Sequence, residues 1–583
     1  MTVKIPLAEY LFRRLHQTGL RAVHGVPGDY NLTLLDHVIP SGLEWVGNCN
    51  ELNGGYAADG YARVKGIGAI VTTFGVGELS AINAIAGSYA EMAPVVHIVG
   101  TPMQNLQSKG VKLHHSFCSG APRDYELFAE MYERVTVAKA NLLDVETAPA
   151  EIDRVIRACL EQSRPVYLRF PMDMVGQMVP ESLLSTSLQL PPVLNDLGQE
   201  GVVAQRILQK ILDAKQPMIL VDGGASRYGL SRHAQELVET TGFPTTTTPF
   251  GKGIIEENLP NFHGIYATVG DFDYDSYVKG CDLVVNLGPV HSNVNTYYFA
   301  TVPKEDITIT IDRTSIRIGE EEVAIRPGPV LDRVIESLRF SESFPVKPRD
   351  ELPTSDTALQ QLPDVNPTDK FSQSIFWRRM SHFFRPGDIL LTETGTASLG
   401  ARDFVLPRDT TLINSSVWLS IGYMLPASQG AALAQRHIVQ SAETNSQSAT
   451  PQGRTILFQG DGSFQMTAQE MSTILHKKLD MIVFLINNNG YTIERLIHGP
   501  EESYNDVAPW KYLECASFFG VESTESYPTL KARVSTWGEL DEVLAKRDFH
   551  SGKGLRMVEV MMEKEDCNDT LRLLLDIYKA KKG

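Results

Sequence analysis

The chain has 583 residues, a formal net charge of −17, and ordinary proportions of apolar (43%) and charged (21%) side chains. This apolar content is enough for several hydrophobic cores, which excludes a globally disordered protein. The excess of acidic residues argues against a nucleic-acid partner, which would attract a basic surface. No apolar run approaches the ~20 residues of a membrane span, and residues 1–20 resemble an amphipathic helix rather than a secretory signal.

The six cysteines are widely spaced, at positions 49, 118, 159, 281, 515 and 567, and none forms a C-x-x-C pair. This spacing is typical of reduced thiols and not of a disulfide framework or a zinc cluster. We therefore expect a cytoplasmic protein with no membrane partner.

Two polar stretches that contain several prolines divide the chain, at 179–195 and 341–370. Proline removes a backbone donor and biases the preceding residue toward extended geometry, so neither stretch favours a continuous element. The sequence predicts three domains, over residues 1–180, 195–340 and 365–583. A further polar stretch, 441–453, predicts an exposed loop within the last domain.

Continuous apolar runs occur in every block, without the polar alternation of a half-exposed strand. They are Ala69–Phe74, Val95–Val99, Met218–Val221, Leu283–Leu287, Ile307–Ile311, Thr455–Phe458 and Met481–Ile486. Because helical patterns alternate with these runs, the sequence predicts an α/β protein with three doubly wound parallel-sheet domains. Ligands of such sheets bind beyond the carboxyl ends of the strands, so functional residues are expected in those loops.

In the first block, a predicted helix begins near Glu51, within the segment NELNGGYAADGYAR (50–63). A lone glutamate at a helix start usually interacts with the helix dipole. His114 and His115 form an adjacent pair on a predicted loop, where histidines are by default exposed to solvent. Neither feature alone indicates chemistry.

In the third block, residues 455–493 are the most informative segment. A predicted strand ends in the sequence GDGS (460–463), and a second predicted strand ends in NNNG (487–490). A helix predicted over about 466–478 connects them, so the segment is a right-handed βαβ unit.

That crossover places Asp461 and Asn488 at the ends of two parallel strands. With a free backbone carbonyl such as that of Gly490, their oxygens form a site that Mg²⁺ prefers, completed by phosphate oxygens and water. Ser463 opens the connecting helix, whose N-terminal amides favour a diphosphate. GDG alone recurs by chance, but GDGS followed by NN-x-G at this distance is a specific signal.

The pair of motifs resembles the diphosphate and metal motif of thiamine-diphosphate enzymes, and segment 50–63 resembles the catalytic-glutamate segment of the same family. The resemblance covers nearly the whole chain and points to the 2-oxo acid decarboxylases, especially the fungal pyruvate decarboxylase branch. It implies an aminopyrimidine-binding domain (1–180), a central domain (195–340) and a diphosphate-binding domain (365–583). The implied cofactors are thiamine diphosphate and Mg²⁺.

The resemblance also implies roles for individual residues. Glu51 would hydrogen-bond the aminopyrimidine ring and activate the cofactor, which then serves as the electron sink. The implied acids and bases are Asp29, His114, His115 and Glu494, together with Glu51. The implied metal ligands are Asp461, Asn488 and Gly490. The implied cofactor-binding residues are Glu51, Thr394, Thr396, Leu419, Ser420, Ile421, Asp461, Gly462, Ser463, Asn488, Gly490, Tyr491 and Ile493.

Two segments of the third block carry finer implications, although each alone would indicate ordinary loop or core. Segment 393–396 (ETGT) is similar to the loop that lines the substrate site and helps to bind the diphosphate. Segment 416–422 (SVWLSIG) is similar to the loop that bends the cofactor. By this match the Leu419 carbonyl would accept from the cofactor's amino group, and Ile421 would lie between its two rings.

In the family the cofactor lies between two protomers, with Glu51 from one chain and Asp461 from the other. The resemblance therefore implies an obligate homodimer, and a homotetramer is expected as a dimer of dimers. The implied reaction is the non-oxidative decarboxylation of a 2-oxo acid to an aldehyde and CO₂, with pyruvate as the leading substrate.

Several positions depart from the pattern of the pyruvate enzymes. Val294 and Leu399 replace residues that are commonly aromatic, and Leu419 replaces a usual glycine. Phenylpyruvate, indolepyruvate and branched-chain 2-oxo acids therefore stay open as substrates, although the retained Ile493 favours small ones. Met92 replaces a histidine linked to substrate activation, so we expect hyperbolic kinetics, which a Hill coefficient clearly above one would contradict.

Three other functions fit the sequence less well. A carboligase of the acetolactate synthase type shares Glu51 and the metal motif, but it lacks the histidine pair and usually carries a flavin. A nicotinamide dehydrogenase would need G-x-G-x-x-G after a strand, with an acidic residue ~20 positions on, and we find no convincing example. A non-enzymatic subunit would be expected to have lost Glu51 or the metal ligands.

Overall fold

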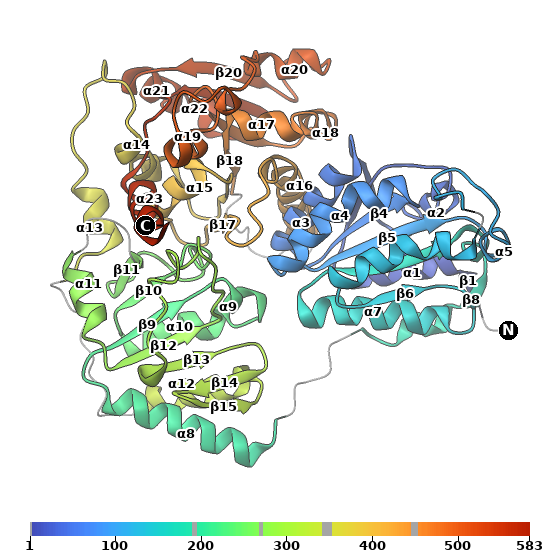
Figure 1. Cartoon of the computed structure of the whole chain (residues 1–583), viewed down its shortest axis with the longest axis horizontal. Coiled ribbons are helices and arrows are strands. Elements are labelled where there is room, and N and C mark those ends of the chain that lie inside the picture. Colours follow the sequence, from blue (N-terminus) through green and yellow to red (C-terminus); the bar gives the residue numbers. More distant parts are fainter. Residues whose placement is uncertain are drawn as a thin grey trace.

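The computed structural model describes residues 3–119, 121–188, 195–266, 272–340, 352–444 and 453–582. Figure 1 shows three lobes that follow the chain in order, blue, green and orange to red, each with helices packed on a sheet. The predicted fold class, an α/β protein with three parallel-sheet domains, is confirmed. No helix within the described ranges has the length and apolar character needed to cross a membrane.

The first sheet has six parallel strands in the order β3-β2-β4-β5-β7-β6. Its strands are β2 (Ala22–Gly25), β3 (Glu44–Gly47), β4 (Gly68–Thr73), β5 (Val95–Thr101), β6 (Lys139–Asn141) and β7 (Val166–Pro171). The helices of this domain include α1 (Leu7–Gln17), α3 (Glu51–Lys65), α4 (Val76–Ala90) and α7 (Ala148–Gln162). The predicted strands at 69–74 and 95–99 are β4 and β5, which are buried along their whole length.

The start of the first predicted linker differs from the structure. The stretch from 179 was expected to begin a linker, but its first residues belong to strand β8 (Met178–Pro180). This strand pairs antiparallel with β1 (Lys4–Pro6), where Val179 lies opposite Ile5. Val179 is buried, so packing against the N-terminal strand overrides the turn-like composition. Residues 189–194 lie outside the described ranges.

The central sheet has the order β11-β10-β9-β12-β13-β14-β15. Its strands are β9 (Pro217–Val221), β10 (Thr245–Thr247), β11 (Phe262–Ile265), β12 (Leu283–Leu287), β13 (Thr308–Ile311), β14 (Ser315–Ile318) and β15 (Glu321–Ala324). Its longer helices are α8 (Leu197–Asp213), α10 (Ser231–Thr241) and α12 (Pro327–Arg339). β14 runs antiparallel to β13, and β15 runs antiparallel to β14, because the connections 312–314 and 319–320 are too short for a crossover.

The third sheet has six parallel strands in the order β17-β16-β18-β19-β21-β20. They are β16 (Ile389–Thr392), β17 (Thr411–Ile413), β18 (Thr455–Gly460), β19 (Met481–Asn487), β20 (Thr529–Val534) and β21 (Leu555–Met561). The helices that concern the site are α15 (Thr396–Gly400), α16 (Met424–Thr444), α17 (Asp461–Thr467), α18 (Glu470–His476), α19 (Thr492–His498) and α23 (Asp569–Lys582).

The helix predicted over 466–478 is wrong in its bounds. Two helices occupy this region, and the first begins at Asp461 directly after the strand. The Asp461 carboxylate accepts from the backbone N–H of Gly462 at 2.8 Å, so the GDGS sequence forms the first turn of the helix itself. The second helix ends at His476, two residues earlier than predicted.

The other two polar stretches are only partly described. Residues 341–351 lie outside the described ranges, but 355–360 forms a helix, α13 (Ser355–Gln360), within the stretch expected to lack one. The side chain of Thr354 caps this helix by accepting from the N–H of Thr357. In the predicted loop 441–453, α16 continues through Thr444, and residues 445–452 lie outside the described ranges.

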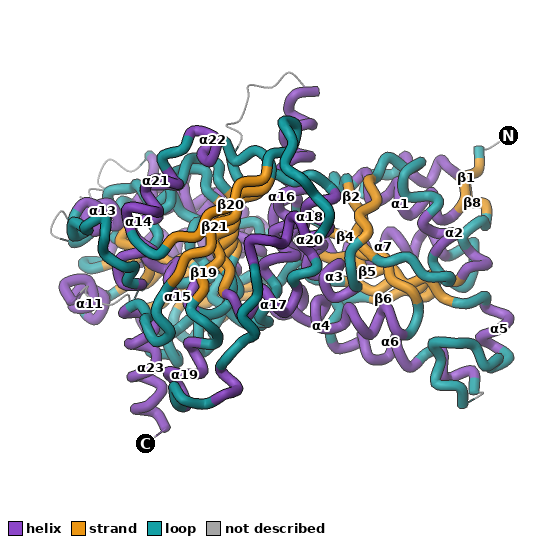
Figure 2. The backbone as a smooth tube through the Cα atoms, turned by 90° about the horizontal axis from the view of Figure 1, so that it is seen from above, coloured by secondary structure: helices purple, strands orange, loops and turns teal. Residues whose placement is uncertain are grey.

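The first and third domains are joined by two helices, α3 and α16, which lie side by side at the junction of the two lobes (Figure 2). Glycines allow their close approach: a Cβ on Gly60 would lie 2.1 Å from the carbonyl oxygen of Ala427, and one on Gly430 would lie 1.9 Å from that of Ala57. Because any side chain there would clash with backbone, this junction holds the two domains in one arrangement.

Candidate active site

The predicted metal ligands lie at the carboxyl ends of two neighbouring parallel strands, β18 and β19. Asp461 follows β18 and is 1% exposed, and its second carboxylate oxygen accepts from the N–H of Gly490 at 2.9 Å. Asn488 follows β19 and is also buried. The sheet topology thus brings together residues that are far apart in the sequence.

Three oxygens converge at this point without a donor between them. The Asn488 amide nitrogen donates to Thr492 Oγ1 at 2.7 Å. Its oxygen then lies 3.1 Å from Asp461 Oδ1 and 2.9 Å from the carbonyl oxygen of Gly490. The reversed amide satisfies the protein without a ligand, because its nitrogen would donate to both of these oxygens, whereas this orientation presents three oxygens to a cation. A carboxylate, an amide oxygen and a carbonyl are ligands typical of a hard divalent ion.

The electrostatics of Asp461 agree with this interpretation. Burial raises its pKa to about 6, and the N–H groups of Gly490 and Gly462 offset only part of that shift. A buried carboxylate with a raised pKa is stabilised in its ionised form by a neighbouring positive charge. Asp461 therefore fits the role of a metal ligand better than that of a purely structural residue.

A cavity of about 240 Å³ opens beside these oxygens. Candidates from four loops of the third domain line it: Thr394, Thr396, Leu419, Ile421, Asp461, Gly462, Ser463, Asn488, Gly490, Tyr491, Ile493 and Glu494. Thr394 Oγ1 is buried and has no hydrogen-bond partner in the described part of the chain, so it is available to a ligand. Ser420 differs, because its hydroxyl lies 2.7 Å from that of Tyr56 in the first domain.

The far wall of the cavity is apolar. It includes Val294 from the central domain, Leu399 from α15, and Leu571, Leu574 and Leu575 from α23. Val294 and Leu399, which stand where the pyruvate enzymes commonly carry aromatic residues, thus line the same cavity as the metal motif. The C-terminal helix supplies apolar surface to it, which the sequence analysis missed because its leucines match ordinary helix periodicity.

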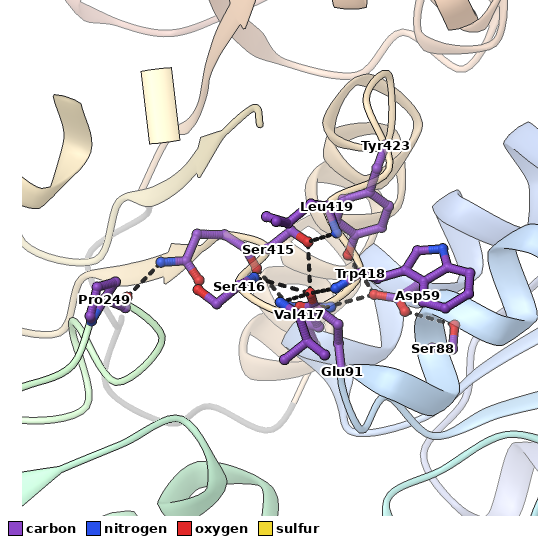
Figure 3. Close-up of polar contacts among 12 residues, drawn as sticks. Asp59, Ser88, Glu91, Pro249, Ser415, Ser416, Val417, Trp418, Leu419 and Tyr423 are labelled. Carbon is purple, nitrogen blue, oxygen red and sulfur yellow. Dashed lines mark hydrogen bonds and ion pairs between the residues drawn. The ribbon is translucent and has the colours of Figure 1, made fainter. Parts of the chain in front are cut away.

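The loop before α16 is held by a buried glutamate of the first domain, Glu91 (Figure 3). Its Oε1 accepts from the hydroxyl of Ser415 at 2.6 Å and from three successive backbone N–H groups, those of residues 416–418, each at 3.0 Å. Arg63 donates to its other oxygen at 3.2 Å. These bonds lead to Leu419, whose φ of 55° lies in the region that favours glycine.

Sequence analysis did not identify Glu91 as functional. It ends a helix and carries no motif of its own, and its contacts to residues 415–418 are separated from it by more than 300 positions. The two domains must be placed against each other before this role becomes visible.

The remaining candidates gather on the first domain. His114 Nε2 lies 2.8 Å from Asp29 Oδ2, and the His114 ring stacks on Tyr30 with centroids 5.0 Å apart. His115 completes a cluster in which the ligating atoms of Asp29 and both histidines lie within 4.8 Å of one another. The structure therefore brings three of the predicted acids and bases together.

Glu51 is the first residue of α3, after Asn50, whose side chain caps the helix by accepting from the N–H of Asn53 at 2.8 Å. It faces Gly77 in the first turn of α4, where a Cβ would lie 2.8 Å from Glu51 Oε1. The glycine therefore leaves room for the carboxylate, which is partly exposed.

The candidates form two separate groups. The residues found to line the cavity belong to the central and third domains, and Asp29, Glu51, His114 and His115 are not among them. Within the described part of one chain, these four first-domain residues thus do not line the cavity beside the metal motif, whereas Glu494 does.

Comparison with known proteins identifies the family. Three family models match: the thiamine pyrophosphate enzyme N-terminal TPP-binding domain over residues 5–119, the central domain over 204–332, and the C-terminal TPP-binding domain over 393–560. The chain belongs to the thiamine pyrophosphate enzyme family. The cofactor that these domain descriptions name is the thiamine diphosphate predicted from the motifs.

Full-length relatives place the chain more closely. It is 50% identical over 574 residues to the pyruvate decarboxylase of Aspergillus parasiticus, covering 98% of this chain and 97% of that protein. It is 38% identical to pyruvate decarboxylase isozyme 1 of Saccharomyces cerevisiae, covering 97% of each. The sequence predicted a resemblance to the fungal pyruvate decarboxylases, and this is confirmed. The prediction that the protein is a thiamine-diphosphate-dependent enzyme of that class is confirmed as well.

A solved structure is similar over most of its length. The thiamine diphosphate-dependent 4-hydroxybenzoylformate decarboxylase of Rhodococcus jostii RHA1 matches with a TM-score of 0.73, covering 96% of this chain and 99% of that one. At 18% sequence identity this likeness shows the shared fold alone.

Proposed function

We propose that this protein decarboxylates a 2-oxo acid without oxidation, converting pyruvate to acetaldehyde and CO₂, with thiamine diphosphate and Mg²⁺ as cofactors. The observation that carries the proposal is the convergence of the Asp461, Asn488 and Gly490 oxygens beside the cavity. The full-length similarity to proteins named pyruvate decarboxylase supports the choice of reaction and substrate.

Each cofactor group has protein residues suited to bind it. Asp461, Asn488 and Gly490 would hold Mg²⁺ through oxygen ligands. The first turn of α17, with Gly462 and Ser463, would bind the diphosphate through backbone N–H groups. Thr394 and Thr396 would add hydroxyl groups, and Leu419, Ser420, Ile421, Tyr491 and Ile493 would contact the rings. When bound, thiamine diphosphate supplies an electron sink for the pair released as CO₂ leaves.

The chain itself supplies the proton chemistry. Glu51 would hold a proton at the aminopyrimidine ring, with space provided by Gly77. Asp29, His114 and His115 form one hydrogen-bonding group that can pass protons to and from the reacting carbon. Glu494, at the first turn of α19, lines the cavity and is placed to protonate or deprotonate the substrate from the other side.

We further propose that the active protein is a homodimer, since the two groups of candidates lie apart within one chain. Glu51, Asp29 and the histidine pair of one copy would face the metal motif of another. A homotetramer would arise as a dimer of dimers. A cytosolic location belongs to the same proposal and is supported by cysteine spacing that fits no disulfide framework.

One observation favours a second substrate class. Val294 and Leu399 line the cavity at positions that are commonly aromatic in the pyruvate enzymes. Smaller side chains there leave more room beyond the reacting carbon, which would admit phenylpyruvate or a branched-chain 2-oxo acid. A methylene in an apolar pocket changes selectivity by only ~1–3 kcal/mol, so pyruvate stays the leading candidate.

The test is CO₂ release from the purified protein with thiamine diphosphate and Mg²⁺, comparing pyruvate with phenylpyruvate at matched concentrations. Faster release from pyruvate supports the first proposal, and faster release from phenylpyruvate supports the second. Protein stripped of metal with a chelator is the control and should be inactive until Mg²⁺ is restored. No release from either substrate would overturn the decarboxylase assignment for both.

A further inference from the structure

Glu393 is a fully buried carboxylate at the point where three cofactor-binding loops of the third domain meet. It directly follows β16, and its relative exposure is 0%. The family resemblance implied a role for its segment, 393–396, but no individual role for Glu393. Its own backbone is held between strands, since its N–H donates to the carbonyl oxygen of Phe458 at 3.0 Å.

The carboxylate accepts hydrogen bonds from three separate segments. Its Oε1 accepts from the backbone N–H of Thr394 at 2.8 Å. Its Oε2 accepts from the backbone N–H of Met424 at 3.0 Å and from the side-chain amide of Gln459 at 3.2 Å. The same Gln459 nitrogen donates to Ser463 Oγ at 2.9 Å.

Each of these contacts ends on a different part of the proposed cofactor site. Thr394 begins the loop whose hydroxyls are placed near the diphosphate. Met424 begins α16 and follows the segment 419–421, which is proposed to contact the cofactor rings. Gln459 lies in β18, two residues before the metal ligand Asp461. One side chain therefore connects the diphosphate, ring and metal segments.

The donors around Glu393 favour its ionised form, but burial has the larger effect. The pKa of Glu393 is raised to about 7, although the bonds from Met424, Thr394, Gln459 and Gly422 lower it. A protonated carboxyl would bring its own hydrogen toward groups that already donate. These partners are N–H donors and not an ion-pair partner, so burial of this group is costly unless every donor stays in place.

We propose that Glu393 is a positioning residue for the thiamine diphosphate site, which fixes the Thr394 loop, the segment before α16 and the end of β18 relative to one another. This inference rests on the proposed function. Glu393 itself does not touch the cofactor in this role. It acts through Thr394, Gln459 and Ser463. Its loss should therefore weaken cofactor binding more than substrate binding.

The test measures the Kd of thiamine diphosphate at saturating Mg²⁺ by isothermal titration calorimetry, beside the melting temperature of the cofactor-free protein. Glu393→Gln nearly preserves volume but replaces one acceptor oxygen with an amide that faces a donor. We expect its Kd to rise about tenfold or more, since hydrogen bonds to a charged group are among the strong ones. The KM for substrate at saturating cofactor should change less than twofold.

Glu257→Gln is the matched control. Glu257 is another buried carboxylate, which accepts from Lys252 Nζ at 2.7 Å and from the N–H of Leu406 at 2.9 Å. It contacts none of the three loops, so its loss should lower the melting temperature without changing the cofactor Kd. Should Glu393→Gln not fold, Gln459→Met, which removes the link from Glu393 to Ser463, is expected to raise the Kd about threefold or more.

The outcomes separate the two proposals. Wild-type affinity in Glu393→Gln or, where that variant does not fold, in Gln459→Met would overturn the positioning role alone. Equal weakening in the Glu257→Gln control, in proportion to the lost melting temperature, would also overturn it. A wild-type protein that binds no thiamine diphosphate would overturn the proposed function and this inference with it.

Discussion

Buried carboxylates recur near the carboxyl ends of the strands, and their partners decide their roles. Burial raises the pKa of Glu78 and Glu393 to about 7 and that of Asp461 to about 6. Glu78 is satisfied by the N–H of Gly75 and the hydroxyl of Tyr167, both at 2.8 Å. Asp461 instead turns one oxygen toward two further oxygens. Of these three carboxylates, Asp461 is the one whose surroundings a cation would balance.

The raised pKa of Asp461 predicts how cofactor binding depends on pH. Below about 6 the cofactor-free protein protonates this carboxyl, which must lose its proton before it can bind Mg²⁺. Affinity for thiamine diphosphate with Mg²⁺ should therefore fall about tenfold for each pH unit below 6. Conversely, because the folded pKa is raised, protonation stabilises the cofactor-free fold, and this contribution is lost as pH rises through about 6.

Calorimetric titration between pH 5 and pH 7.5 checks this expectation. Asp461→Asn is the control, since it cannot titrate at this position and should bind weakly at every pH. A wild-type affinity that is constant across the range would contradict the assignment of Asp461 as a metal ligand.

A second residue-scale prediction concerns the apolar wall. Val294→Phe fills the cavity from the central domain without touching the metal motif. We expect it to raise the ratio of kcat/KM for pyruvate over that for phenylpyruvate by about tenfold, within the ~1–3 kcal/mol that a pocket contact supplies. Steady-state kinetics with both acids measure the ratio. Val294→Leu is the conservative control, and an unchanged ratio in Val294→Phe would place the substrate elsewhere.

At the scale of elements, the loop 415–419 shows how strain is retained. Leu419 has a left-handed backbone, although a leucine there costs of order 1 kcal/mol or more. Two sets of bonds keep the loop in this form. Backbone N–H groups of the loop donate to Glu91, and the Leu419 N–H donates to Ser415 Oγ at 2.9 Å. In the proposed role Leu419 contributes only its backbone carbonyl, so we expect its side chain to be replaceable.

This argument predicts opposite effects for two substitutions in the same element. Leu419→Gly should keep kcat within about threefold, because glycine adopts the same backbone without strain. Glu91→Ala should lower kcat at least tenfold, because four donors of the loop and Arg63 lose their acceptor. Turnover and cofactor Kd of each variant provide the measurement. A large loss in Leu419→Gly would mean that its side chain, and not only its carbonyl, contacts the ligand.

How much could be predicted from sequence also varies by element. The buried strands could be predicted because the apolar runs of β4 and β19 are short and continuous. They show neither the 3.6-residue periodicity of an amphipathic helix nor the alternation of a half-exposed strand. The bounds of α17 were missed, because Gly460 to Ser463 resemble a turn until the strand and helix are placed together. Glu91 and Glu393 lay beyond sequence reasoning, since their partners come from segments far along the chain.

At the scale of the whole molecule, the domain arrangement explains the separation of the two candidate groups. Helices α3 and α16 approach closely through Gly60 and Gly430, which joins the first and third domains in one arrangement. In that arrangement the Glu51 end of α3 lies at the interface between the first and third domains. No described residue of the first domain lines the cavity. In the described part of one chain, the cavity beside the metal motif is thus lined without Glu51.

The packing therefore predicts complementation between two inactive variants. Glu51→Gln and Asp461→Asn should each lower kcat by 100-fold or more alone. Co-expressed with different affinity tags and purified through both, mixed dimers should carry one intact site and one doubly altered site. They should regain about half of the wild-type kcat per dimer, because each intact site draws Glu51 from one copy and Asp461 from the other. Were both residues to act within the same chain, neither site would be intact and the mixed dimers would stay inactive.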